Sequence, residues 1–331
     1  DEQGRANGFS LLLLGLLCLF GGEEVACNDE RGKAYLIRSA SMNNRLGALF
    51  AGYWLTNGKA PEIPIRRLRE GLNDVFLLSQ LDNFFLFPGR PRTMIPKEYK
   101  TRGMNFLAHA AKSPYAAGSR LLAVQLCDSC NPAACLPSLE RAALLGDRSA
   151  LKALGYALCG LPFNGDFHAL AEERLVAVDA EKGLFYLRLL ARLPLDDSND
   201  VTDILFAVES FRDGKAVPQD EKSALQLCRV IAEHGHPSAI IALGEMIYHG
   251  RGCPHDAALA FDMLRGVRYV SHGFEDFAWR IARARLLSRM FEEGSGTPRN
   301  LEKAALYSHL AAKLDEERSL LGSIYAGAYV E

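Results

Sequence analysis

The chain repeats one short phrase with variations, and this repetition constrains the fold more than any other feature. The phrase is a helical segment that contains Ala-Leu-Gly or a close equivalent, followed by an aromatic or apolar residue and then by glycine. It is clearest between residues 239 and 256, where Leu243 and Gly244 are followed by Gly250, Gly252 and Asp256. A phrase that recurs at a near-fixed spacing indicates stacked supersecondary units, because one such unit cannot bury its apolar face alone.

The period can be measured on the glycine that follows the leucine, or on the residue that replaces it. These anchor positions are, in chain order, Gly15, Gly52, Asn83, Val124, Gly155, Val208, Gly244, Ser288 and Gly322. Several intervals are close to roughly 36 residues, and the longest, between Gly155 and Val208, leaves room for an extra helix. The sequence therefore predicts about eight helix pairs in one continuous domain.

Glycines at regular places predict where helices end. A residue without a Cβ adopts the left-handed conformation of a helix C-terminus at no steric cost. The glycines at such places are Gly21, Gly58, Gly146, Gly214, Gly250 and Gly294. The last three are each followed, six residues later, by a residue whose side-chain oxygen we expect to cap the next helix. These capping residues are Asp220, Asp256 and Asn300.

The phrase and its caps resemble the Sel-one-like repeat, a relative of the tetratricopeptide repeat. The best matches are AVESFRDGKAVPQDEKSALQL from Ala207, ALGEMIYHGRGCPHDAALAF from Ala242 and LLSRMFEEGSGTPRNLEKAAL from Leu286. The resemblance implies an all-α fold, a right-handed α-solenoid (superhelix) of about eight antiparallel helix-hairpin repeats, with residues 1–331 as a single solenoid. Two stretches depart from the pattern: 57–101, a degenerate repeat with an irregular connection, and 164–203, an irregular repeat with an extra helix.

Composition agrees with a packed repeat protein. The chain has 331 residues, 49% of them hydrophobic, which is enough to bury a large core. Its formal net charge of -2 argues against nucleic acid as a main partner, because phosphate binding needs a concentrated basic field.

The apolar segment from Phe9 to Phe20 has the length of a signal-peptide core and is too short to cross a bilayer as a helix. Gly15 and Gly21 fit the repeat, and the preceding Asp1 and Glu2 are wrong for a basic leader. We therefore expect a first repeat helix, with a retained signal segment as the alternative. We expect no membrane span elsewhere.

The eight cysteines bear on the compartment. Cys18 and Cys27 lie near the end of one predicted helix and the start of its partner, and Cys127 and Cys135 repeat that arrangement. Some secreted bacterial proteins of the family hold their repeats together with disulfides at similar spacing. The resemblance thus implies disulfides within these two pairs and a periplasmic location. The alternative is that the cysteines only replace small apolar residues in a core, as in a cytoplasmic protein.

The sequence offers little for catalysis or metal binding. Cys127, Cys130 and Cys135 have the spacing of part of a zinc site, but no fourth Cys or His lies close in sequence. His234 and His236 lie where the pattern expects a turn. No metalloprotease, hydrolase, phosphate-binding or dinucleotide-binding motif occurs in its required context. We predict no catalytic residue, no metal and no cofactor.

A binding surface can be predicted from the geometry of stacked hairpins. The first helix of each pair tends to line the concave side, so residues beside the small packing positions point into the groove. These candidates are Lys152, Tyr156, Glu209, Arg212, Glu245, His249, Arg285, Arg289 and Glu292. Arg90 and Arg92 are added from the irregular stretch of residues 73–102, because aromatic residues and arginines often anchor interfaces.

The sequence therefore predicts a protein-binding scaffold whose partner is another protein. The family that the chain resembles includes envelope immunity proteins, which neutralise toxic phospholipase effectors delivered by type VI secretion. The most specific hypothesis is accordingly an immunity protein that sterically inhibits such a secreted toxin. A cytoplasmic adaptor or regulatory scaffold for protein complexes is the alternative.

Overall fold

The computed structural model describes residues 7–20, 27–57, 96–114, 116–128, 132–162, 167, 170, 176–194, 198–267 and 276–328. All regular structure within these residues is helical. The chain divides into two compact units, Asp1–Tyr186 and Leu187–Glu331, and each is described by itself.

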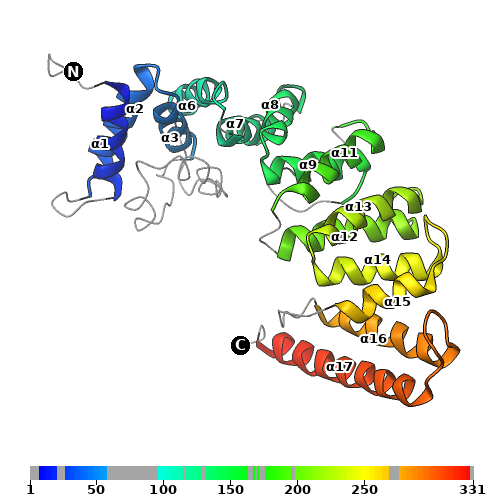
Figure 1. The fold of residues 1–331 in the computed structure, drawn as a ribbon. Helices are drawn as coiled ribbons and strands as arrows, with labels where there is room; N and C mark the ends of the chain where they lie inside the picture. Colours follow the sequence, from blue (N-terminus) through cyan, green and yellow to red (C-terminus); the bar gives the residue numbers. More distant parts are fainter. Residues whose placement is uncertain are drawn as a thin grey trace. The chain divides into compact units, whose positions relative to one another are not determined.

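The first unit is a stack of helix hairpins (Figure 1). Its helices are α1 (Gly8–Phe20), α2 (Asp29–Ser41), α3 (Arg45–Asn57), α6 (Lys97–Ala110), α7 (Ala116–Asp128), α8 (Pro132–Leu144), α9 (Arg148–Cys159) and α11 (Ala180–Arg192), which runs on into the second unit. The pairs are α1 with α2, α3 with α6, and α7 with α8. Leu12 and Leu16 of α1 are buried in the shared core, which confirms Phe9 to Phe20 as a packed repeat helix.

Glycines let the paired helices of this unit lie in close contact. A Cβ on Gly15 of α1 would lie 2.8 Å from Leu36 Cδ2, and one on Gly32 of α2 would lie 3.1 Å from the carbonyl oxygen of Gly15. Gly52 and Gly103 repeat this arrangement between α3 and α6. The anchor glycines of the repeated phrase therefore stand where one helix backbone meets the next.

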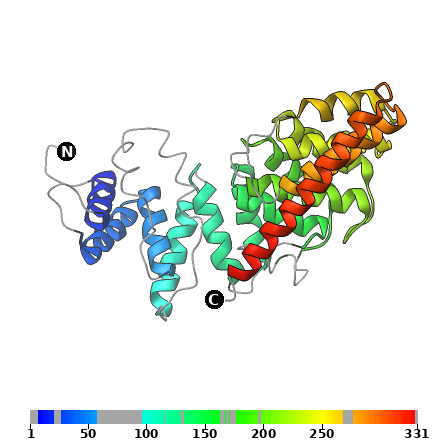
Figure 2. The ribbon, with the colours of Figure 1, turned by 90° about the horizontal axis from the view of Figure 1, so that it is seen from below.

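The second unit contains three more hairpins, which Figures 1 and 2 show from two directions. Their helices are α12 (Ser198–Asp213), α13 (Glu221–Glu233), α14 (Pro237–His249), α15 (Ala257–Gly266), α16 (Asp276–Glu293) and α17 (Leu301–Ala328). The pairs are α12 with α13, α14 with α15, and α16 with α17; α13 and α16 also pack on α14. The all-α helical-repeat fold predicted from the sequence is thus confirmed.

The predicted helix ends are confirmed where they fall on described residues. Gly214, Gly250 and Gly294 have φ of 70°, 67° and 73°, and Gly146 ends α8 with a φ of 89°. Gly21 and Gly58 lie outside the described residues.

The predicted caps are confirmed as well. Asp220 Oδ1 accepts a hydrogen bond from the amide of Ser223 at 3.1 Å, and Asp256 Oδ1 accepts one from Leu259 at 2.9 Å. Asn300 Oδ1 does the same for Lys303 at 2.9 Å. Each cap satisfies an amide that the first turn of its helix leaves without a backbone partner.

Each of these loops contains a second residue with a left-handed backbone. In the two later loops this residue packs against the first turn of the second helix of the preceding hairpin. Gly252 has a φ of 73°, and a Cβ on it would meet the carbonyl oxygen of Glu221 in the first turn of α13. Gly296 has a φ of 72°, and its Cβ would meet the carbonyl oxygen of Ala257 in the first turn of α15. In the first such loop the position is Ala216, with a φ of 66°.

The structure differs from the predicted period at its last anchor. Gly322 was expected to mark another unit, but α17 continues unbroken from Leu301 to Ala328. The stretch from Leu301 to Leu321 contains no glycine or proline that could end the helix. Asn83, most of the predicted degenerate repeat 57–101 and part of the irregular stretch 164–203 lie outside the described residues, so those predictions stay untested.

Among the described residues, no helix combines the length and the apolar character that a membrane span requires.

Candidate interaction site

The structure brings five of the predicted partner-binding residues together on the first helices of the second unit. Glu209 and Arg212 lie on α12, Glu245 and His249 on α14, and Arg289 on α16. Arg212 acts electrostatically on Glu245, and both Arg212 and Arg289 act on His249. We call these five residues the A-helix face.

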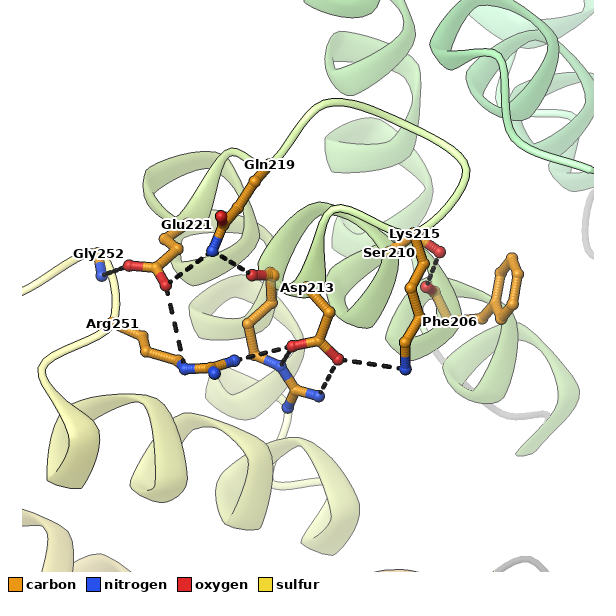
Figure 3. Close-up of polar contacts among 9 residues, drawn as sticks. Phe206, Ser210, Asp213, Lys215, Gln219, Glu221, Arg251 and Gly252 are labelled. Atoms are coloured by element: carbon orange, nitrogen blue, oxygen red, sulfur yellow. Dashed lines mark hydrogen bonds and ion pairs between the residues drawn. The ribbon is translucent and has the colours of Figure 1, made fainter.

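Asp213 holds the charges beside this face in place. It is the last residue of α12, because Gly214 ends the helix there. Its Oδ1 lies 2.8 Å from Arg212 Nε and 2.8 Å from Arg251 Nη1, and its Oδ2 lies 3.4 Å from Lys215 Nζ (Figure 3). The hydrogen bonds from Arg212, more than any other contact, hold the pKa of the Asp213 carboxyl well below its usual range.

The same contacts join the loops of two successive hairpins. Arg251, in the loop after α14, reaches back to Asp213 and lies 4.0 Å from Glu221 Oε1 at the start of α13. The amide of Gly252 donates to Glu221 Oε2 at 3.1 Å, and Gln219 Nε2 donates to Glu221 Oε1 at 3.2 Å (Figure 3). These bonds fix the orientation of Arg212 and Arg251 at the edge of the A-helix face.

Two carboxylates of the face, those of Glu209 and Glu245, are half-buried. Among the described residues, neither Glu209 nor Glu245 accepts a hydrogen bond or forms an ion pair at its carboxylate. Partial burial raises the pKa of Glu245, Arg212 opposes this, and the nearby charge of Glu209 raises it further. A cation brought by a partner would relieve the repulsion between these two acids.

His249 is exposed at the end of α14. Partial burial lowers the pKa of His249, and the positive charges of Arg251 and Arg289 lower it further. Its ring contacts the Tyr248 ring edge-on, with 5.0 Å between the centroids. The hydroxyl of Tyr248 donates to Glu293 Oε2 on α16 at 3.1 Å, which ties α14 to the next hairpin.

This arrangement suits recognition by charge and hydrogen bonding. α12 and α14 each contribute an acidic and a basic side chain, α16 contributes Arg289, and each of these residues lies on a helix rather than in a loop. No group of three or more His, Cys, Asp or Glu among the described residues could hold a metal ion.

Other predicted contact residues have different roles. Tyr156 is only 3% exposed in the core of the first unit, so the expectation that it points into an open groove is wrong. The reason is that the second half of α9 is buried on all its sides, since every residue from Ala153 to Cys159 is buried. Lys152, one turn earlier on α9, is half-buried.

Arg285 is exposed but already engaged, because its Nη2 lies 2.9 Å from Asp315 Oδ2 on α17. Glu292 is exposed near the end of α16. Arg90 and Arg92 lie outside the described residues.

The paired cysteines carry free thiols in the structure. The Cys127 and Cys135 side chains contact one another, and the hydrogen bond that the Cys135 thiol donates to Cys127 raises the pKa of the Cys135 thiol. The amide of Asn28 donates to the Cys18 carbonyl at 2.6 Å, which brings the backbone beside Cys27 to the end of α1. Disulfides within the two pairs stay a prediction.

The fold defines a class of protein, the all-α helical-repeat proteins. The Sel1 repeat model matches residues 9–44, 209–236, 237–265 and 284–316. The chain thus carries Sel1 repeats in both units, and the three matches in the second unit cover the A-helix face. Proteins built from Sel1 repeats act as protein-binding scaffolds and are generally not enzymes.

Solved structures give a weaker likeness. A Sel1 repeat protein from Oxalobacter formigenes has 18% identity and a TM-score of 0.45, with 95% of this chain and 86% of that chain covered. The protective antigen c5321 of uropathogenic Escherichia coli, which displays an SLR fold, has 16% identity and a TM-score of 0.44, with 98% and 65% covered. A search of curated proteins found no match.

The site residues that sequence reasoning missed are Asp213, Arg251 and Glu221. They lie at a helix end, in a loop and in a first helical turn, where the repeat pattern alone predicts only capping and turning. A signal was present, since a loop arginine at 251 has an acidic residue at the corresponding helix end of the preceding hairpin.

Proposed function

We propose that the chain is a protein-binding scaffold of the bacterial envelope, and that its specific role is immunity against a phospholipase effector delivered by type VI secretion. The chain would bind the toxin and cover its active site or substrate entrance, with no chemistry of its own. A preformed surface favours such inhibition, because little ordering free energy is lost on binding.

The observation that carries the binding role is the convergence of charges on the A-helix face. Glu209, Glu245 and Arg289 come from three successive hairpins, and none of their charged groups forms an ion pair within the described part of the chain. Arg212 is fixed at its edge by Asp213. A partner with alternating basic and acidic groups would find complementary charges there.

Reversal of one exposed charge tests this surface. We expect Arg289→Glu to weaken binding of the partner recovered by affinity purification by about tenfold or more, because the charge complementarity is lost. The matched control is Arg229→Glu, an equal charge change at an exposed residue of α13, a helix that contributes no residue to the A-helix face. Isothermal titration calorimetry measures both. Equal weakening by the two variants would place the partner elsewhere than the A-helix face.

The thiol contact between Cys127 and Cys135 supports the envelope part of the proposal, because two thiols in contact oxidise readily where an oxidant is present. We expect protein isolated from its native host without reductant to show four free thiols of its eight, with peptides linked through Cys18–Cys27 and Cys127–Cys135. The measurement is thiol titration in denaturant followed by peptide mass spectrometry. Eight free thiols would contradict the envelope location.

One observation favours the cytoplasmic alternative. Cys159 and Cys228 are fully buried, and burial raises the pKa of each thiol to about 12, so these two act as small core residues. A regulatory scaffold would keep all eight thiols reduced. Gene neighbourhood separates the two functions: an adjacent gene for a secreted lipid-hydrolysing toxin, silenced by coexpression of this chain, supports immunity, and a housekeeping partner supports the alternative.

A further inference from the structure

The last helix of the second unit has an apolar outer side. α17 packs on α16 through one side, where Ala304, Ala311 and Leu314 are buried. On the other side Leu306 is 65% exposed, Leu310 40% and Leu320 64%. Several large apolar side chains exposed on one side of a helix indicate a surface that another protein covers.

The exposed leucines belong to one continuous stripe. Leu306, Leu310, Lys313, Glu317 and Leu320 follow one another at spacings of four and three residues, the spacing of a coiled-coil seam. All five side chains are exposed. α17 is also 28 residues long against 18 for α16, so the hairpin partner is too short to cover its whole length.

The stripe is self-complementary in one orientation. When two copies of α17 lie antiparallel about a two-fold axis at Asp315, positions equally distant from that residue face one another. Leu310 then faces Leu320 of the partner subunit, and Lys313 faces Glu317 of the partner subunit. Because the axis is two-fold, the Leu310–Leu320 contact and the Lys313–Glu317 contact each form twice in the dimer. A parallel pair would instead place Lys313 against its own copy.

The two charges of the stripe are free to pair in this way. Within the described residues, neither Lys313 nor Glu317 forms an ion pair, although Asp315 between them binds Arg285 and Arg318. Isolated exposed leucines would not specify a partner, but leucines that flank a matched Lys and Glu specify both partner and direction.

We propose that α17 is a homodimerisation helix, and that its outer stripe binds the same stripe of a second copy in antiparallel orientation. The interface is isologous, with leucines on either side of two Lys313–Glu317 ion pairs. It uses α17 and leaves the A-helix face of each copy to the partner, so it is independent of the proposed immunity role.

Charge reversal gives a test that depends on pairing rather than on loss of a residue. The chain is expected to be a dimer at about 100 µM by sedimentation equilibrium. Lys313→Glu places Glu against Glu twice, and Glu317→Lys places Lys against Lys twice. Each single variant should dissociate at least about tenfold more readily than the parent. The double variant Lys313→Glu/Glu317→Lys restores opposite charges and should dimerise again.

Mixing supplies the sharpest outcome. Equimolar Lys313→Glu and Glu317→Lys proteins, each weakened alone, should form a heterodimer in which both facing pairs are opposite in charge. Arg229→Glu is the control, since it makes the same charge change on α13 and should leave the dimer intact. Circular dichroism checks that each variant is folded. A parent chain that is monomeric at about 100 µM, or a mixture that gives no heterodimer, overturns the proposal.

Discussion

Asp147→Ala should lower the free energy of unfolding of the first unit by about 4 kcal/mol. Asp147 Oδ2 lies 2.9 Å from Arg120 Nε, and the two side chains are 4% and 1% exposed. Its Oδ1 also accepts the amide hydrogen bond of Ala150 at 2.8 Å and so caps α9. The substitution removes the cap and leaves the Arg120 guanidinium buried without this carboxylate.

Two further variants separate these contributions. Asp147→Ser keeps an oxygen for the cap and should cost less than alanine, although the buried Arg120 guanidinium loses this carboxylate. Arg120→Met combined with Asp147→Ser removes both charges and should recover most of the loss, since buried pairs are often replaceable by apolar groups. Urea titration followed by Trp54 fluorescence, in a Trp279→Phe background, reports on the first unit. A double variant less stable than Asp147→Ser alone would contradict this account.

Gly252→Ala is expected to destabilise the second unit by about 3 kcal/mol. The new methyl group would meet the carbonyl oxygen of Glu221, and the backbone there has a φ of 73°. A clash with backbone at a helix start cannot be relieved by rotation of a side chain. The loop would have to lift, and the bonds from Arg251 to Asp213 and from Gly252 to Glu221 would lengthen.

Gly235→Ala is the matched control for this substitution. Gly235 has a φ of 80°, and no atom lies within 4 Å of where its Cβ would be. It should cost only the left-handed backbone strain, about 1 kcal/mol. Thermal unfolding together with hydrogen exchange of α13 and α14 measures both variants. Equal losses of stability in the two variants would show that the contact between the Gly252 loop and α13 contributes nothing to stability.

The sequence predicts the local parts of this fold well, because their causes are local. Gly214 and Gly250 end helices since only a small residue adopts a left-handed φ without strain, and Asp220 and Asp256 cap helices through their own side chains. The same reasoning failed at Gly322, where the familiar phrase lies inside a continuous helix. The Ala-Leu-Gly phrase alone does not end a helix. The helix ends at the loop residues that usually follow the phrase.

The candidate site was predictable only in part, for a different reason. Glu209 and Glu245 share one position of the repeat, so periodicity places them on the same face. Arg251 and Asp213 meet because one hairpin is seated on another, which no pattern within a single repeat reveals. Tyr156 occupies the position just after its anchor, as Glu209 does, yet it is buried together with the rest of the second half of α9. Whether such a position is open depends on the neighbouring hairpin.

The seating of each loop on the preceding hairpin gives the second unit a direction. The loop after α14 rests on α13, and the loop after α16 rests on α15, so every later hairpin depends on an earlier one. Deletion of α16 and α17 would remove the Tyr248–Glu293 hydrogen bond and the packing of α16 on α14, but would leave the contact of Gly252 with α13 in place. Deletion of α12 and α13 would take away the platform on which Gly252 rests. Stepwise truncation from the two sides should therefore give unequal losses of cooperativity. Deletions that begin at α12 should lower the cooperativity of unfolding more than deletions that begin at α17.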